Sequence, residues 1–498
     1  MHDVPLLLTL VSLLAGPGAP PRSQPEDLGA NSQRGKELMA AGRYAEAVPI
    51  YRALVKALPG NPGLLVNLGM ALHLSGEHQQ AVPHLEAALR LDPGSLPAAL
   101  FLGASNLRLG RTTAAVAPLR KAVRLQPDNQ QARSLLAQAL LQLDRQAEAE
   151  PHLRRMAELA PSDPAAWYNL GQAYEELAGQ AFAALLGHDP ESPFALVLVA
   201  DARLQEDRRD AAFQLYRQAL ERRPALRGVH TALAEIYRAT GHPDWAAVEE
   251  KRERALPPRD CAREALACAF SAEKYHDVVA TASKAATPEG HYWLIRAYNE
   301  LATRAFGKLM ALPPSAQSHE WMARQHRNGR RYAESVEQWR QAITLAPGDG
   351  RLKLGLAETL RLSRDFAGAQ RVLEELLRAQ PGAPEANFLL GDVLLAQEQP
   401  ERAIPFLEKG VCVGPEAHGA LGRAYALVGR PADAIGHLKQ ALSADVDGSF
   451  RYQLARAYQA TGQADLARTA LEDYEAFRKG PEAGSDTLAK PPSITPPE

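Results

Sequence analysis

The sequence has few aromatic residues and no excess of charge of either sign. Aromatic side chains make up 6% of its 498 residues, which is low for a protein built from packed sheets. Lysine and arginine number 56 against 58 aspartate and glutamate, so the net charge is -2 at pH 7. A chain this close to neutral has no electrostatic field that would gather nucleic acid or an anionic membrane. No nucleic-acid partner is therefore expected.

Cysteine is also scarce, with three residues in the chain. An odd number predicts at least one thiol that is free or paired between molecules. Cys261 and Cys268 are seven residues apart on an expected helix, which would separate them by about 10.5 Å along its axis. That distance is too long for a disulfide unless the helix unfolds. We expect both to be small, buried packing residues.

Long apolar runs are missing beyond the first twenty residues, so no integral membrane segment is expected after them. Residues 5–15 are apolar and have the length of a signal-peptide core, although no lysine or arginine precedes them. We expect residues 1–19 to be a signal peptide and 20–27 a linker. The protein would then be exported, to the periplasm or outside the cell. The alternative is a hydrophobic leader on a cytoplasmic protein.

The sequence does contain a repeat with a period of 34 residues. Segments 62–95, 96–129 and 130–163 share leucine at position 7, glycine or alanine at position 8, alanine at 20, leucine at 24 and proline at 32. Small residues at 8 and 20 let two antiparallel helices cross closely. The proline ends the second helix because it lacks an N–H and clashes with the preceding turn. The period predicts stacked pairs of helices.

This pattern resembles the tetratricopeptide-repeat family in its multi-repeat bacterial form. The family's W-x2-L-G-x2-Y opening is reproduced at Trp167, Leu170, Gly171 and Tyr174. The resemblance covers nearly all of residues 28–477. It implies an all-α, right-handed α-solenoid of stacked antiparallel helix pairs with about 12–14 repeats.

We expect four regions in this solenoid. The first array covers residues 28–259, a degenerate helical repeat covers 260–287, and a second array covers 288–479. Residues 480–498 form a proline-rich tail that is too polar to bury a core, and we expect it to be disordered with a solvated end.

Two repeats lack about five residues of the turn between their helices, after Tyr174 and after Tyr298. Each is expected to form one fused helix of some 20 residues, about 30 Å long. Segments 168–185 and 292–309 share ten identities in eighteen positions at an offset of 124, which indicates a duplicated module. The fused helices are either joints or docking faces of the solenoid, or the trace of a tolerated deletion.

In the family, side chains that bind peptides project from the first helix of each pair onto the inner wall of the superhelix. The resemblance assigns this role to Val66, Asn67, Met70, Leu100, Phe101, Ser134, Gln138, Tyr168, Asn169 and Gln172. Ser32 and Lys36 stand where members that bind a terminal carboxylate carry lysine and asparagine, which argues against recognition of a free C-terminus. The resemblance implies a non-catalytic scaffold or adaptor that binds peptide segments or partner subunits, in a bacterial envelope assembly.

Motifs for catalysis and cofactors are missing: the sequence has no phosphate-binding loop, H-E-x-x-H, G-x-S-x-G or C-x-x-C. Because almost every residue belongs to a repeat, we expect no enzyme activity, cofactor or metal. His73, His78 and His84 share no helical face, so we expect surface histidines. Two alternatives stay open, a helical-repeat RNA-binding protein and an accessory subunit of an enzyme whose catalytic domain is on another chain.

Overall fold

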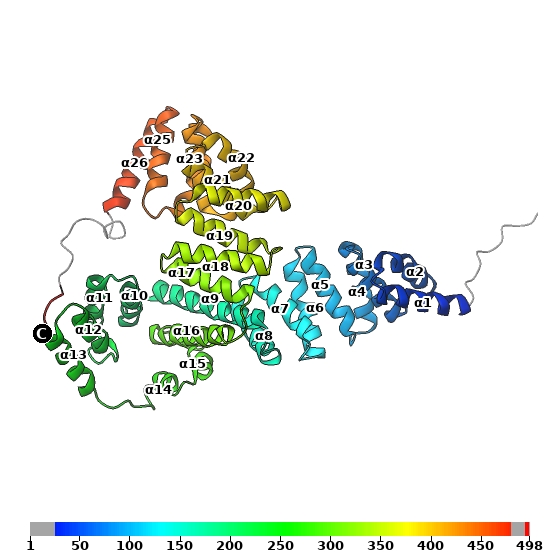
Figure 1. The fold of residues 1–498 in the computed structure, drawn as a ribbon, viewed down its shortest axis with the longest axis horizontal. Coiled ribbons are helices and arrows are strands. Elements are labelled where there is room, and N and C mark those ends of the chain that lie inside the picture. Colours follow the sequence, from blue (N-terminus) through cyan, green and yellow to red (C-terminus); the bar gives the residue numbers. More distant parts are fainter. Residues whose placement is uncertain (1–24, 480–493, 498) are drawn as a thin grey trace, which may run out of the picture. The chain divides into compact units, whose positions relative to one another are not determined.

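The structure is a computed structural model that describes residues 25–479 and 494–497. These residues form 26 α-helices and two short 3-10 helices, and no strand occurs among them. The predicted all-α solenoid of antiparallel helix pairs is confirmed (Figure 1). The expected signal peptide, residues 1–19, lies outside the described residues. The first described helix begins at Pro25, within the segment expected to be a linker.

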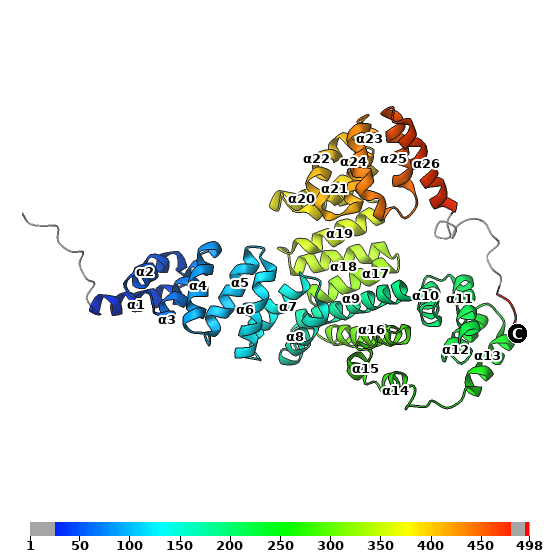
Figure 2. The same ribbon diagram turned by 180° about the vertical axis from the view of Figure 1, so that it is seen from behind.

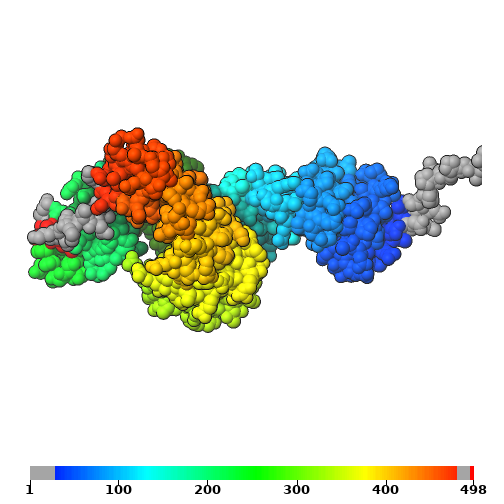
Figure 3. Space-filling model, turned by 90° about the horizontal axis from the view of Figure 1, so that it is seen from above, coloured from blue at the N-terminus to red at the C-terminus, as the bar shows by residue number. Residues whose placement is uncertain are grey.

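The chain divides into two compact units, residues 1–159 and residues 160–498. The described part of unit 1 consists of four helix pairs: α1 (Pro25–Ala40) and α2 (Tyr44–Ala57), α3 (Pro62–Leu74) and α4 (His78–Leu91), α5 (Leu96–Arg108) and α6 (Thr112–Leu125), and α7 (Gln130–Leu141) and α8 (Gln146–Leu159). Its second, third and fourth pairs begin at Pro62, Leu96 and Gln130, as the 34-residue period predicts, whereas its first pair begins at Pro25, before the expected start at residue 28. Side chains close the spaces between its successive pairs, as the blue-to-cyan surface in Figure 3 shows.

A short polar side chain caps the first helix in three of these pairs. Asn61 accepts a hydrogen bond from the backbone N–H of Leu64 at 3.1 Å, and Asn129 accepts one from Ala132 at 2.8 Å. Ser95 caps α5 in the same way. Each cap satisfies a backbone donor that has no partner inside the helix, which fixes where the repeat begins.

The recurring glycine allows the two helices of a pair to cross closely. A Cβ atom added at Gly69 would lie 2.5 Å from Cγ of Leu85, and one added at Gly103 would lie 2.4 Å from Cγ of Leu119. These distances are shorter than any ordinary carbon contact. The glycine at position 8 therefore faces the leucine at position 24 of its own repeat.

Unit 2 contains the remaining helices. They are α9 (Pro164–His188), α10 (Pro193–Gln205), α11 (Arg209–Arg222), α12 (Val229–Ala239), α13 (Pro243–Ala255), α14 (Ala265–Ser271), α15 (Tyr275–Ala282), α16 (Pro288–Met310), α17 (Ala316–Asn328), α18 (Tyr332–Leu345), α19 (Gly350–Leu362), α20 (Phe366–Ala379), α21 (Pro384–Ala396), α22 (Pro400–Gly410), α23 (Pro415–Leu427), α24 (Pro431–Ala441), α25 (Ser449–Ala460) and α26 (Ala464–Lys479). Two 3-10 turns, Val411–Val413 and Leu442–Ala444, follow α22 and α24.

The two predicted fused helices are confirmed as α9, with 25 residues, and α16, with 23 residues. They pack against each other and lie side by side in both Figure 1 and Figure 2. Tyr174 stacks on Tyr298 with ring centroids 6.2 Å apart, and Tyr168 meets Phe306 edge-on at 6.3 Å. The contacting residue number rises along one helix as it falls along the other, so the two helices are antiparallel. We call them the long-helix pair.

In the long-helix pair, each fused helix packs against the other fused helix and not against a second helix of its own repeat. Each fused helix lacks the turn that would let it fold back, so its first half packs on the second half of the other one. The helices that follow are exchanged as well, because α10 contacts α16 and α17 contacts α9. Phe194 of α10 lies 5.2 Å from the ring of Tyr292, and Arg324 of α17 forms an ion pair with Glu175 at 3.5 Å. The missing turn therefore links the two copies of the duplicated module.

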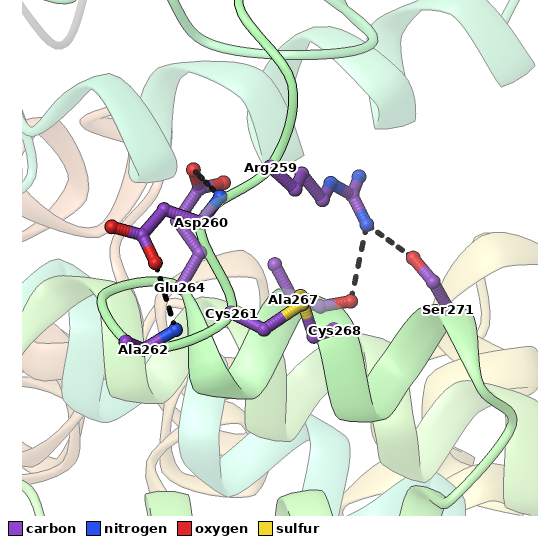
Figure 4. Close-up of a disulfide and its surroundings, with 8 residues drawn as sticks. All are labelled: Arg259, Asp260, Cys261, Ala262, Glu264, Ala267, Cys268 and Ser271. Atoms are coloured by element: carbon purple, nitrogen blue, oxygen red, sulfur yellow. Dashed lines mark hydrogen bonds between the residues drawn. A yellow bond between two sulfur atoms is a disulfide. The ribbon is translucent and has the colours of Figure 1, made fainter.

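The expectation for two of the cysteines was wrong. Cys261 and Cys268 form a disulfide with their Cα atoms 5.7 Å apart (Figure 4). The chain is not helical at Cys261, because Asp260 accepts a hydrogen bond from the N–H of Ala262 at 3.0 Å in a turn and α14 begins only at Ala265. Cys261 is exposed and Cys268 half-buried, so neither is a buried packing residue. Cys412 is free and exposed, as the odd number predicted.

The end of the tail, expected to be solvated, is only partly so in the residues that can be described, where Thr495 and Pro496 are exposed. Residues 480–493 and 498 lie outside the described part of the chain. In the segment Ile494–Pro497, Thr495 is hydrogen-bonded to side chains of α11 and α12. Ile494 and Pro497 are half-buried.

Candidate functional site

The first helices of unit 1 form one continuous wall, because α3 contacts α5 and α5 contacts α7. Seven of the ten predicted peptide-binding residues belong to these helices. Val66 and Leu100 are buried, with 8% and 7% of their surface exposed, so they pack within the wall. The other five are accessible to a ligand. Asn67, Met70 and Phe101 are half-buried, and Ser134 and Gln138 are exposed.

His73 joins this wall and is not the surface residue that the sequence predicted. It is half-buried, its Nδ1 lies 2.9 Å from the hydroxyl of Ser105, and its ring lies 5.3 Å from that of Phe101. Burial, with smaller contributions from His78 and Arg108, lowers the pKa of His73 to about 4. The imidazole is therefore neutral at pH 7.

The five accessible residues of the wall that the sequence predicted carry no charge at neutral pH. Amide side chains such as Asn67 and Gln138 can donate to and accept from the backbone of an extended peptide. Phe101 and Met70 offer apolar surface beside them. The wall can thus hold a peptide by its backbone and its apolar side chains.

The other three predicted residues lie in unit 2, on α9. Tyr168 has 2% of its surface exposed, and its hydroxyl accepts a hydrogen bond from Gln172 at 2.7 Å and one from Arg324 at 3.5 Å. Burial, helped by the nearby Glu320, raises the pKa of Tyr168 well above its usual range. Tyr168 is therefore a neutral contact between α9 and α17. Asn169 and Gln172 are half-buried.

A cavity of about 760 Å³ in unit 2 was not predicted from the sequence. It lies between the α11–α12 connection on one side and α14–α16 on the other. Its aromatic lining includes Phe194, Phe270, Tyr292 and Trp293. A chain with so few aromatic residues concentrates several of them here. The adjacent Tyr292 and Trp293, one turn before Arg296, were the signal in the sequence that could have indicated the site.

Arginine side chains lie over the aromatic rings of this cavity. The guanidinium of Arg296 is 5.4 Å from the ring centre of Phe270 and 5.5 Å from that of Tyr292, and it donates a hydrogen bond to the Tyr292 hydroxyl at 2.6 Å. Arg223 lies 4.9 Å over the ring of Phe194. Each pair combines cation–π attraction with packing, which orients the arginine.

Two buried polar atoms of the cavity lining have no hydrogen-bond partner. They are Nε1 of Trp293 and Oε2 of Glu253. A buried polar atom without a partner costs free energy, so both atoms lower the stability of this lining. Groups of three or more residues suited to a metal ion are absent from the described part of the chain. Among the same residues, no helix has the length and apolar character needed to cross a bilayer.

Sequence comparisons identify the repeat directly. Three family models, each described as a tetratricopeptide repeat, match the chain. The first matches residues 32–95, 102–164 and 360–418, the second matches 417–452, and the third matches 448–473. A comparison with curated proteins gives no match.

Several solved structures are similar to parts of this chain. The crystal structure of MamA protein is 21% identical, with 40% of this chain and 93% of that chain covered and a TM-score of 0.29. The APC/C hetero-tetramer Cut9-Hcn1 is 14% identical over 92% of this chain and 95% of that chain, with a TM-score of 0.34. A tetratricopeptide repeat protein from Parabacteroides merdae ATCC 43184 is 12% identical over 67% and 99%, with a TM-score of 0.31.

Proposed function

Because the chain is a multi-repeat tetratricopeptide-repeat (TPR) protein, we propose that it is a non-catalytic scaffold that binds extended segments of partner proteins on the inner wall of unit 1. The observation that carries this proposal is the contact of α3 with α5 and of α5 with α7, which makes three first helices one surface. Asn67, Phe101 and Gln138 are accessible on that surface. An extended peptide can use such amide groups for its backbone and apolar residues for its side chains.

A photoreactive amino acid placed at Gln138 tests this proposal in cells of the native host. Gln138 is exposed on α7, so an occupied wall should give covalent adducts there. Glu86 is exposed on the second helix α4 and serves as the matched control position. Adducts at Gln138 and none at Glu86 are expected.

A second set of variants identifies the contact chemistry. Phe101→Ala should lower the yield of the Gln138 adduct several-fold, because a central aromatic contact often contributes more than 1 kcal/mol to binding. Asn67→Ala should lower it less. Equal adducts at Glu86 and Gln138, or a yield unchanged by Phe101→Ala, would contradict binding on this wall.

The proposal extends to an exported protein that works in a bacterial envelope assembly. Two features support export. Residues 5–15 have the length and apolar character of a signal-peptide core. The disulfide between Cys261 and Cys268 fits an oxidising compartment, where such bonds persist.

Cell fractionation followed by N-terminal sequencing tests the export proposal. We expect the chain outside the cytoplasm, with a mature form that begins near residue 19. Recovery of the chain from the cytoplasm with Met1 intact and both cysteines reduced would contradict it.

A further inference from the structure

The described end of the tail is held by two side chains from different helices. The Tyr237 hydroxyl of α12 donates a hydrogen bond to the carbonyl oxygen of Thr495 at 2.7 Å. Nη1 of Arg217, from α11, donates to the hydroxyl oxygen of Thr495 at 3.2 Å. The partners are 258 and 278 residues apart in the sequence, so chain connectivity does not bring them together.

The hydroxyl of Tyr237 is fixed in place by its surroundings. Its ring packs edge-on against Phe213 at 5.5 Å and against Trp245 at 5.6 Å, and 1% of the residue's surface is exposed. Burial, with the charge of Glu249, raises the pKa of Tyr237, so the hydroxyl remains a donor at neutral pH. A donor held this rigidly loses little conformational entropy when it binds an acceptor.

The tail segment has the chemistry of an extended ligand. Pro496 confines Thr495 to extended backbone conformations, and neither Pro496 nor Pro497 has an N–H. The carbonyl groups of such a segment have no internal partner and remain free to accept hydrogen bonds. Ile494 and Pro497 are half-buried, while Thr495 and Pro496 are exposed. The apolar ends therefore lie on the protein, and the polar centre is hydrogen-bonded.

We propose that Arg217 and Tyr237 form a docking site for an extended Thr-Pro-Pro segment, and that the chain's own residues 494–497 occupy it in cis. The site lies on α11 and α12 of unit 2, so it does not depend on peptide binding by the wall of unit 1. A tethered segment acts at an effective concentration in the millimolar range. The tail therefore excludes free segments of the same chemistry from this site.

Fluorescence anisotropy with a labelled peptide of residues 492–498, PSITPPE, tests the site. A chain that ends at Lys479 keeps every described helix and should bind the peptide saturably, whereas the full-length chain should bind it at least ten-fold more weakly. A peptide with Thr495→Val keeps the side-chain shape without the hydroxyl, and we expect its binding to be roughly 2- to 10-fold weaker. A helical far-UV circular dichroism spectrum and the same cooperative thermal unfolding as the full-length chain check that the shortened chain is folded.

Tyr237→Phe in the shortened chain removes the donor hydroxyl and keeps the ring. It should weaken peptide binding roughly 2- to 10-fold. Tyr458 stands at the same repeat position in α25 and is also buried, so Tyr458→Phe is the matched control and should leave binding unchanged.

Three binding results would overturn the proposal. They are no saturable binding to the shortened chain, equal binding to both chain lengths, and equal effects of the two tyrosine substitutions. Light scattering should give full-length and shortened chains the same number of copies per particle. A loss of copies on removing the tail would show that the segment docks between molecules and would overturn the occupancy in cis.

Discussion

Gly171 of α9 lies directly against the ring of Phe306 of α16, so that a Cβ atom added at Gly171 would come within 2.6 Å of Phe306 Cζ. In a regular repeat the equivalent glycine faces a leucine of the same repeat, as Gly69 faces Leu85. Here Phe306, which belongs to another repeat, takes the place of that leucine. The contact shows that the long-helix pair rebuilds the usual crossing of two helices from residues far apart in the chain.

Two glycines of α9 should respond in opposite ways to the same substitution. Gly171→Ala forces the methyl group into Phe306, and we expect it to lower the free energy of unfolding by about 1–3 kcal/mol. Gly179→Ala adds a methyl group that would meet nothing within 4 Å apart from its chain neighbours and its own helix backbone, and it should raise that free energy by up to about 1 kcal/mol, because glycine is unfavourable inside a helix. Denaturant unfolding followed by far-UV circular dichroism measures both. Equal effects would contradict the close crossing.

Phe306 and Phe182 stand at equivalent positions of the duplicated module, but their surroundings differ. Phe306 is 4% exposed, whereas Phe182 is half-buried and borders a cavity of about 390 Å³ together with Ile295. Ile295 stands at the position that corresponds to Gly171 in the other copy, and its side chain occupies space beside the helix crossing. Phe306→Ala should therefore cost about 3–5 kcal/mol, and Phe182→Ala clearly less. The same unfolding measurement compares them, and a larger loss for Phe182→Ala would contradict this reading of the two sites.

The disulfide should stabilise α14 locally. This helix has seven residues, too few to be stable without tertiary support. Opening the short loop that Cys261 and Cys268 close should cost about 2 kcal/mol, which corresponds to roughly 30-fold faster amide exchange in α14. A comparison of amide hydrogen exchange in α14 between the Cys261→Ser variant and the parent chain measures this change. Exchange in α3, which belongs to unit 1, is the internal control and should not change.

The stability of unit 1 should fall as the pH falls below 6.5. The pKa of His73 is about 4 in the folded chain and 6.5 when the group is unperturbed. Between these values the unfolded chain binds a proton that the folded chain does not, so unfolding is favoured as the pH drops. The shift sets an upper limit of about 3.5 kcal/mol, since one pKa unit corresponds to about 1.4 kcal/mol, and the half-buried position makes the real effect smaller.

His73→Gln removes this titration and keeps a polar side chain. The variant should lose less stability than the parent chain between pH 6.5 and pH 4, as measured by thermal unfolding at each pH. Burial also lowers the pKa of His84, so part of the pH dependence should remain. A curve for His73→Gln that is parallel to that of the parent chain would contradict a neutral His73 in the fold.

The sequence predicted each helix pair well because local signals define it. A capping residue such as Asn61, a glycine at position 8 and a proline near position 32 all act within one repeat. The missing turns after Tyr174 and Tyr298 likewise predicted two fused helices. The partner of each fused helix could not be predicted in this way, since the pairing of α9 with α16 depends on residues more than a hundred positions apart.

The predictions for Cys261, the tail and His73 differed from the structure for separate reasons. The expected helix at Cys261 is replaced by a turn, because the Asp260 carboxylate bonds a backbone N–H that a helix would need. The tail looked solvated because its composition cannot form a core, but Thr495 needs only two side-chain partners to be held. His73 looked like a surface residue because its neighbours Ser105 and Phe101 belong to the next repeat.

The exchanged pairing also affects how the protein is made. In most repeat arrays each newly synthesised repeat can pack against the repeat just before it. The ribosome must add 135 further residues after Gly171 before Phe306 exists, which takes roughly 7 to 27 seconds at common elongation rates. During that interval the nascent chain carries the apolar side of α9 without its final neighbour. A chaperone that covers this side of α9 would protect the growing polypeptide during that interval.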